Sequence, residues 1–230
     1  MTVRATLLHC WKAPFDGVPR LAPVKAALDR ILDAHDSMRE KHAAIGKDSK
    51  LSAEGRKDAV RKHLAEATGR DLYRAGKAVE AMRAKLDKER AALVTLAPDK
   101  DGGAMREEMR TVLRGLDIGR RAAMLMAPNA DANLLRAAIE APDFLSGIDA
   151  NIRAAVADRI VEMAHPGALA ELERDAAAVE VLEAACRVTA NAARTAGEFP
   201  TDGLFAEFLN EAVAPRTAAI DQEVERALAA

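Results

Sequence analysis

A long helical pattern, weakened locally at Gly69 and Gly76, runs through residues 52–96. Apolar side chains recur at three- and four-residue spacing from Val60 to Leu93, Ser52 is suited to cap the first turn, and Pro98 follows the last. A helix of about 44 residues would be about 66 Å long at a rise of 1.5 Å per residue. Because no globular core in a chain of 230 residues needs such a rod, we expect this helix to pair with a neighbouring helix, and its far end to project or to meet a partner chain.

A neighbour of the right kind precedes it. Pro23 stands where a first-turn proline belongs, an apolar stripe at helical spacing runs from Val24 to Ile45, and Gly46 ends the pattern. A polar loop joins the two helical patterns. The sequence therefore predicts a long antiparallel helical hairpin of coiled-coil character over residues 22–98.

The composition favours helices throughout the chain. Alanine occupies 52 of the 230 positions and aromatic residues make up 3%, so the apolar half of the sequence consists largely of small side chains. Such side chains favour helices and pack poorly in sheets. We expect an all-α protein, long enough to bury one or two cores.

Shorter helical patterns follow a polar segment at residues 99–103, where we place a domain boundary. They predict a C-terminal bundle of short helices over residues 104–230. Its first helix is expected over 105–126, and Asp131 and Asp149 are suited to cap two of the later ones.

The N-terminal arm, residues 1–21, has two interpretations. The residues before Trp11 alternate in a way that fits a short strand, whereas the Pro and Gly residues after it fit a loose apolar arm. The pattern is too short to decide whether the arm is a strand, a helix or disordered.

Neither export nor a membrane span is expected from the sequence. The first residues lack a cleavage-site pattern after a long apolar region, and no apolar run approaches the roughly 20 residues that a membrane span needs. Cys10 and Cys186 are far apart and form no CxxC pair, which favours a reduced, cytosolic compartment.

The formal net charge of -2 conceals an uneven distribution. Residues 1–115 carry a net charge of +7 and residues 116–230 a net charge of -9. This division indicates either a basic surface for nucleic acid or an acidic partner, or attraction between the two halves or between two copies arranged head to tail. The second interpretation is favoured, because many acidic residues are spaced among the bases of the first half.

Motifs that carry chemistry are scarce. Residues 46–49 lack the upstream glycine of a phosphate loop, and neither HExxH nor GxSxG occurs. Glu162 and His165 form one Glu-x-x-His pair without the second pair that a di-metal bundle requires. Three imidazoles could approach one another across the hairpin, but they stand among charged residues: His35, His42 and His63. We expect no catalytic, cofactor-binding or metal-ligating residues and no small-molecule substrate; an enzyme with a metal site at these residues is the least favoured alternative.

Two groups of residues are candidates for binding a partner. A basic cluster along the long helix is suited to phosphates or to an acidic partner, although Tyr73 is the only aromatic residue near it for stacking on bases. Its members are Arg56, Lys57, Arg61, Lys62, Arg70, Arg74 and Lys77. An apolar patch near residue 205 is either a docking surface or the packing centre of the C-terminal bundle. Its docking candidates are Phe205, Phe208 and Leu209.

Two stretches resemble known proteins. Residues 45–56, Ile-Gly-Lys-Asp-Ser-Lys-Leu-Ser-Ala-Glu-Gly-Arg, form a polar turn that enters a long charged helix, and residues 141–149, Ala-Pro-Asp-Phe-Leu-Ser-Gly-Ile-Asp, precede an amphipathic helix. Together with Leu169-Ala-Glu-Leu-Glu, they resemble uncharacterised all-helical proteins encoded in bacteriophage and prophage structural gene clusters. The resemblance covers about residues 40–100 and 135–185. It implies a virion or assembly role, in the cytoplasm of a bacterial host or in the virion, and it brings no catalytic residues.

We therefore expect a non-enzymatic structural or assembly protein that acts through helix-mediated contacts with its own copies or with other virion proteins. Small alanine faces permit close approach of helices, and the thin apolar stripe of the long helix leaves surface that a partner would complete. The alternative is a nucleic-acid-associated protein that uses the basic hairpin. It predicts an affinity that falls steeply with salt.

Overall fold

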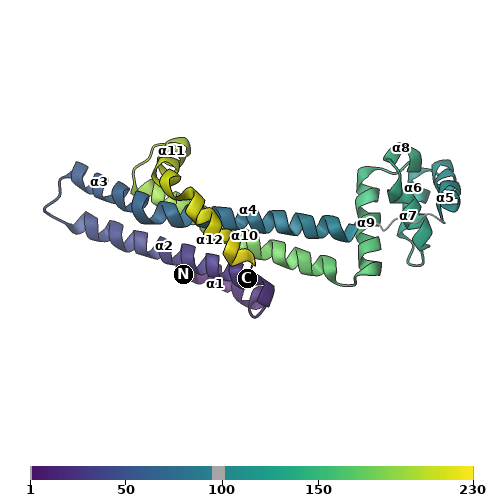
Figure 1. The fold of residues 1–230 in the computed structure, drawn as a ribbon, viewed down its shortest axis with the longest axis horizontal. Coiled ribbons are helices and arrows are strands. Elements are labelled where there is room, and N and C mark those ends of the chain that lie inside the picture. The colour runs from purple at the N-terminus through teal and green to yellow at the C-terminus, as the bar shows by residue number, and fades with distance from the viewer. Residues whose placement is uncertain (1, 95–101, 230) are drawn as a thin grey trace. The chain divides into compact units, whose positions relative to one another are not determined.

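The computed structural model describes residues 2–94 and 102–229 (Figure 1). Every regular element in these two ranges is helical, so the prediction of an all-α protein is confirmed. The chain forms two compact units. The larger unit contains residues 1–86 and 174–230, and the smaller unit contains residues 87–173.

This division differs from the predicted bundle over 104–230. Residues 174–230 belong to the larger unit, because Ala193, Phe199 and Phe205 pack with side chains from the first half of the chain. The predicted helix end at Pro98 and most of the predicted boundary at 99–103 lie outside the described residues.

The N-terminal arm is helical and forms α1 (Val3–Phe15), neither a strand nor a loose arm; the sequence had left these possibilities open. Thr2 caps it by accepting a hydrogen bond from the Ala5 N–H at 3.2 Å. Trp11 and Phe15 lie one helical turn apart, are both buried, and have ring centroids 5.3 Å apart. Trp11 and Phe15 are four residues apart, which is the spacing of one helical turn. The residues before Trp11 alternate with the two-residue spacing of a strand, and this misled the interpretation.

The two long helical patterns are both present. A short 3₁₀ turn, η1 (Pro19–Leu21), leads into α2 (Ala22–Lys47), and α3 (Ala53–His63) continues through η2 (Leu64–Thr68) into α4 (Gly69–Val94). Ser52 caps α3 as predicted, accepting from the Gly55 N–H at 3.1 Å. Helices α2 and α3 lie side by side (Figure 1).

A π turn, η2, interrupts the long helix. The N–H of Gly69 reaches back five residues to the carbonyl of Leu64, which inserts one extra residue into the helix. Helix α11 (Asp202–Val213) packs against this turn. A Cβ atom added to Gly69 would lie 3.0 Å from Cδ2 of Leu209, so glycine permits this close approach.

The rest of the larger unit comes from the end of the chain. It contains the part of α10 (Ala168–Ala196) from Arg174 onward, α11, a short turn η3 (Ala214–Arg216) and α12 (Thr217–Ala229). Asp175 of α10 is buried and pairs with Arg20 of η1 at 2.6 Å. A buried carboxylate requires such a partner, so this pair fixes α10 against the start of α2.

The smaller unit is built from short helices: α5 (Gly103–Gly115), α6 (Ile118–Met126), α7 (Ala132–Glu140), α8 (Asp143–Ser146) and α9 (Ala150–Ala164). The prediction of one helix over 105–126 is wrong. Gly115 ends α5, and Asp117 caps α6 by accepting from the Arg120 N–H at 2.9 Å. The core of the unit contains Leu113, Leu125, Leu134, Leu135, Ala138, Ile148 and Val156.

Three arginines of the smaller unit donate to carbonyl groups at the ends of its helices or in the turns that follow them. The carbonyls at helix ends have no partner within their own helix and carry partial negative charge, so a guanidinium stabilises them. The principal pairs are Arg121 with Leu116 at 2.6 Å and with Gly147, Arg153 with Ile139 at 2.7 Å, and Arg159 with Pro128 at 2.9 Å. The short helices are thus tied together by side chain to backbone contacts as well as by the apolar core.

Candidate functional site

The first part of the predicted basic cluster is engaged within the chain. Arg61 donates from Nε to the carbonyl of Gly197 at 3.0 Å, and its guanidinium carbon lies 4.4 Å from the ring centroid of Phe199. Lys57 lies 3.7 Å from the carboxylate of Glu198. Cations in the first turns of a helix oppose its dipole unless a partner offsets them. Here the segment between α10 and α11 contributes such partners.

The second part of the cluster is also largely paired with acids. Arg74 donates to Asp71 at 2.6 Å and to Glu223 at 2.7 Å. The remaining pairs are Lys77 with Glu80 at 2.7 Å and Lys62 with Glu66 at 4.0 Å, while Arg56 donates to the Gly46 carbonyl at 3.3 Å. Lys62 and Arg70 are the exposed members of the predicted cluster. The cluster is therefore not a continuous row of cations turned toward solvent.

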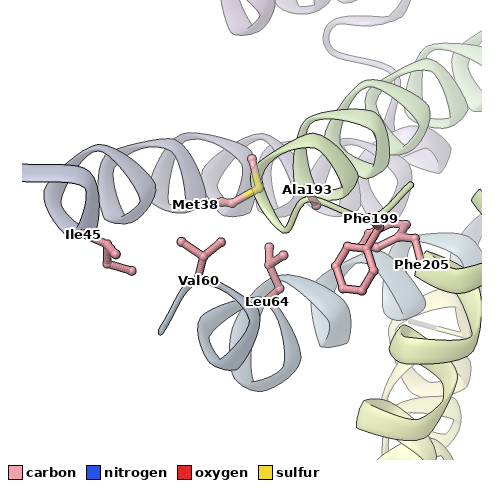
Figure 2. Close-up of a cluster of buried hydrophobic side chains, with 7 residues drawn as sticks. All are labelled: Met38, Ile45, Val60, Leu64, Ala193, Phe199 and Phe205. Carbon is pink, nitrogen blue, oxygen red and sulfur yellow. The ribbon is translucent and has the colours of Figure 1, made fainter. Parts of the chain in front are cut away.

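The predicted docking patch forms part of a core. Phe205 is 6% exposed, and its ring centroid lies 5.3 Å from that of Phe199. Figure 2 shows these two rings beside Leu64, in a cluster that α2, α3, η2, α10 and α11 share. Phe208 and Leu209 are partly buried against the same cluster. The patch is therefore a packing centre, which was the alternative interpretation. It packs with side chains from the first half of the chain as well as with those of the predicted C-terminal bundle.

The histidine and glutamate side chains considered as metal ligands are hydrogen-bonded within the chain or lie at least partly exposed at its surface. His35 is buried, with Nδ1 3.3 Å from a carboxylate oxygen of Asp36. Glu162 accepts a hydrogen bond from the Gly167 N–H at 3.0 Å, and His165 is exposed. Within the two described ranges, no group of three or more His, Cys, Asp or Glu side chains is arranged to hold a metal ion.

Exposed apolar side chains gather on the smaller unit. Phe144 of α8 is 78% exposed, and Val112 and Met105 of α5 are 55% and 44% exposed. Met105 and Val112 are two turns apart on one side of α5, and α8 packs against α5. We call Met105, Val112, Phe144 and Leu145 the α5–α8 apolar face.

The larger unit exposes far fewer large apolar side chains than the smaller unit does. Of the nine large apolar side chains that are exposed in the described part of the chain, eight belong to the smaller unit, and the ninth is Leu204 of α11. The sequence predicted only that Met105 and Val112 belong to a helix, the one expected over 105–126. Periodicity shows that apolar residues share a side of a helix, but it does not show whether anything covers that side.

Two cavities of the larger unit share two arginines. One, of about 630 Å³, lies between α2, α4 and α12 and is lined mainly by alanine and proline. The other, of about 480 Å³, lies between α2 and the η2–α4 segment and is lined mainly by polar side chains. Arg30 and Arg74 line both cavities, so the apolar and the polar hollow meet at a pair of guanidinium groups.

A carboxylate already lies at this pair. Glu223 of α12 accepts from Arg74 at 2.7 Å and from Arg30 at 3.4 Å. The hydrogen bond from Arg74 lowers the pKa of Glu223 by more than its partial burial raises it. Sequence reasoning singled out Arg74 but not Arg30 or Glu223, because 193 residues separate these two and nothing local connects them.

Comparison with known proteins identifies no relative: no protein-family model, no curated protein and no solved structure matches the chain. In residues 2–94 and 102–229, no helix combines the length and apolar character needed to cross a membrane. Function is therefore inferred from the surfaces and cavities of the chain itself.

Proposed function

We propose that the chain is a non-enzymatic assembly protein that associates with further copies of itself through the α5–α8 apolar face. The exposure of the four side chains of this face, between 37% and 78%, carries this proposal. Burying apolar surface is favourable by about 25 cal/mol per Å², and a cluster of exposed apolar side chains is typical of a protein–protein contact.

The charge distribution favours a second copy as the partner. The larger unit carries a net charge of +2 and the smaller unit a net charge of -4, so the smaller unit of one copy attracts the larger unit of the next. The coiled-coil character predicted for residues 22–98 belongs to the same proposal, because alanine-rich helices can approach closely. The resemblance to phage-encoded proteins is the ground for proposing a virion, or a step in its assembly in a bacterial host, as the setting.

Light scattering after size exclusion, over a range of protein concentrations, tests the proposal. We expect a discrete oligomer for the wild type, a shift toward the monomer for Val112→Glu, and the wild-type mass for Leu204→Glu. The two residues are a matched pair, since they are 55% and 49% exposed and only Val112 lies on the α5–α8 apolar face.

Two results would overturn the proposal. One is a wild type that is strictly monomeric at every concentration. The other is a protein that carries nucleic acid, seen as excess absorbance at 260 nm, and loses it as salt rises. The second result would favour the alternative of a nucleic-acid-associated protein, and Lys62→Glu with Arg70→Glu would then weaken binding.

A further inference from the structure

We propose that the cavity between α2, α4 and α12 binds an aliphatic carboxylate, a medium-chain fatty acid in chemical class, with its carboxylate on Arg30 and Arg74. The molecule would be a bound ligand rather than a substrate. This inference does not depend on the proposed function, because the cavity lies in the larger unit and the α5–α8 apolar face in the smaller one.

The walls of the cavity suit a hydrocarbon chain. Its aliphatic lining includes Ala26 and Ala27 of α2, Ala75 and Ala78 of α4, and Val224 of α12. The volume of about 630 Å³ falls within the range of about 300–1,000 Å³ typical of small-molecule sites, which are also mostly apolar with a few polar groups. Small side chains on all three helices leave this space open where larger ones would fill it.

The charged end of the cavity suits a carboxylate. Arg30 and Arg74 together already hold the two oxygens of Glu223, so the donor geometry for a carboxylate exists. In addition, Nε of Arg74 is buried and has no hydrogen-bond partner. A buried donor without an acceptor is costly, and a ligand oxygen would satisfy it.

The balance of charge favours a single negative charge on the ligand. The cavity is lined by Arg20, Arg30, Arg74 and Lys85 and by Glu223, while Asp175 pairs with Arg20 and Asp71 pairs with Arg74. Four cations therefore stand against three carboxylates. A fatty acid would neutralise the one remaining positive charge, whereas a dianionic phosphate would exceed it.

Glu223 occupies the position that the ligand carboxylate would take. Its side chain is 50% exposed and belongs to the last helix, so it can move into solvent when a ligand binds. Glu223 thus competes with the ligand carboxylate for the guanidinium groups of Arg30 and Arg74. Removing its charge is expected to strengthen ligand binding, an effect that a purely structural ion pair would not give.

Isothermal titration calorimetry with dodecanoate, below its micelle concentration, tests the inference on the full chain. We expect one dodecanoate per chain. Arg30→Gln should weaken binding at least tenfold, and Glu223→Gln should strengthen it severalfold. Ala26→Leu, which narrows the cavity, should weaken binding at least tenfold, while Ala43→Leu, at another exposed position of the same helix outside the cavity, should bind as the wild type does.

Several outcomes would overturn the inference. They are the absence of saturable binding, equal binding of dodecyltrimethylammonium, and binding that Arg30→Gln and Ala26→Leu leave unchanged. Loss of binding in Val112→Glu would also overturn it, because it would place the ligand on the α5–α8 apolar face. Glu223→Gln keeps the test decisive if another variant fails to fold, since a failure of Glu223→Gln to strengthen binding contradicts the competitor role.

Discussion

At the scale of single residues, Gly147 combines an unusual backbone conformation with a close contact to Arg121. Its φ of 70° is a conformation that L side chains rarely adopt, and an added Cβ would lie 2.9 Å from Nη1 of Arg121. The same arginine donates to the carbonyl of Gly147. We expect Gly147→Ala to destabilise the smaller unit by about 2–3 kcal/mol, from backbone strain and from displacement of Arg121.

Gly167 provides the matched control for this prediction. Its φ of 82° is equally unfavourable for alanine, but no atom lies within 4 Å of an added Cβ. Gly167→Ala should therefore cost only about 1 kcal/mol. Native-state hydrogen exchange of peptides from residues 103–164 measures both variants, and equal losses of protection would contradict a role for Arg121.

Glu140 gives the smaller unit a dependence on pH. Arg106, only 3% exposed, donates to it at 2.6 Å, and Arg136 donates at 3.0 Å. Burial raises the pKa of Glu140, but the hydrogen bonds from Arg136 and Arg106 outweigh burial, so the pKa lies below its ordinary value. The stabilisation is therefore present above the unfolded carboxyl pKa of about 4.3 and is lost as pH falls through the lower folded pKa.

We expect Glu140→Gln to lower the free energy of unfolding of the smaller unit by about 1–3 kcal/mol at pH 7, since charge-assisted hydrogen bonds are lost. The difference from the wild type should shrink as pH falls below about 4. Urea unfolding followed by circular dichroism from pH 3 to 7 measures it. Glu107→Gln, at an exposed position of α5, is the control. A difference that stays constant with pH would refute the argument.

At the scale of helices, the features encoded by neighbouring residues were predictable. Ser52, Asp131 and Asp149 were expected as caps, and each accepts a hydrogen bond from the first turn of its helix. The break at Asp117 was missed because the apolar period of α5 continues across it. The π turn was missed because its cause is tertiary: the close packing of α11 at Gly69, which no local pattern contains.

The π turn makes a prediction about deletions. Because η2 holds one extra residue, deleting Glu66 leaves a regular helix in which the apolar stripes on both sides keep their phase. We expect this deletion to cost about 1–2 kcal/mol, from changed packing beside α11. Deleting Glu80 from the regular part of α4 should cost more than about 4 kcal/mol, because it rotates every later residue by about 100°.

The two glutamates are matched, since both are exposed and each pairs with a lysine one turn earlier. Urea unfolding followed by circular dichroism of both deletion variants measures the costs. If the two deletions cost the same, the extra-residue description of η2 is wrong.

At the scale of the whole molecule, the sequence left the arrangement of distant segments open. Residues 174–230 complete the larger unit, and nothing in their helical period indicates which earlier segment they contact. The cavity depends on this return, since Glu223 of α12 meets Arg30 of α2 across 193 residues. The α5–α8 apolar face, in contrast, is exposed because no distant segment of the described chain packs against it.

Methionine oxidation by dilute peroxide, followed by mass spectrometry at increasing protein concentration, tests the assembly proposal most directly. Met105 lies on the α5–α8 apolar face and is 44% exposed, whereas Met163 of α9 is 53% exposed and lies outside it. Buried Met82 serves as the slow reference. The account predicts that oxidation of Met105 slows relative to Met163 as copies associate. A constant ratio of the two rates over a concentration range in which the mass rises would contradict it.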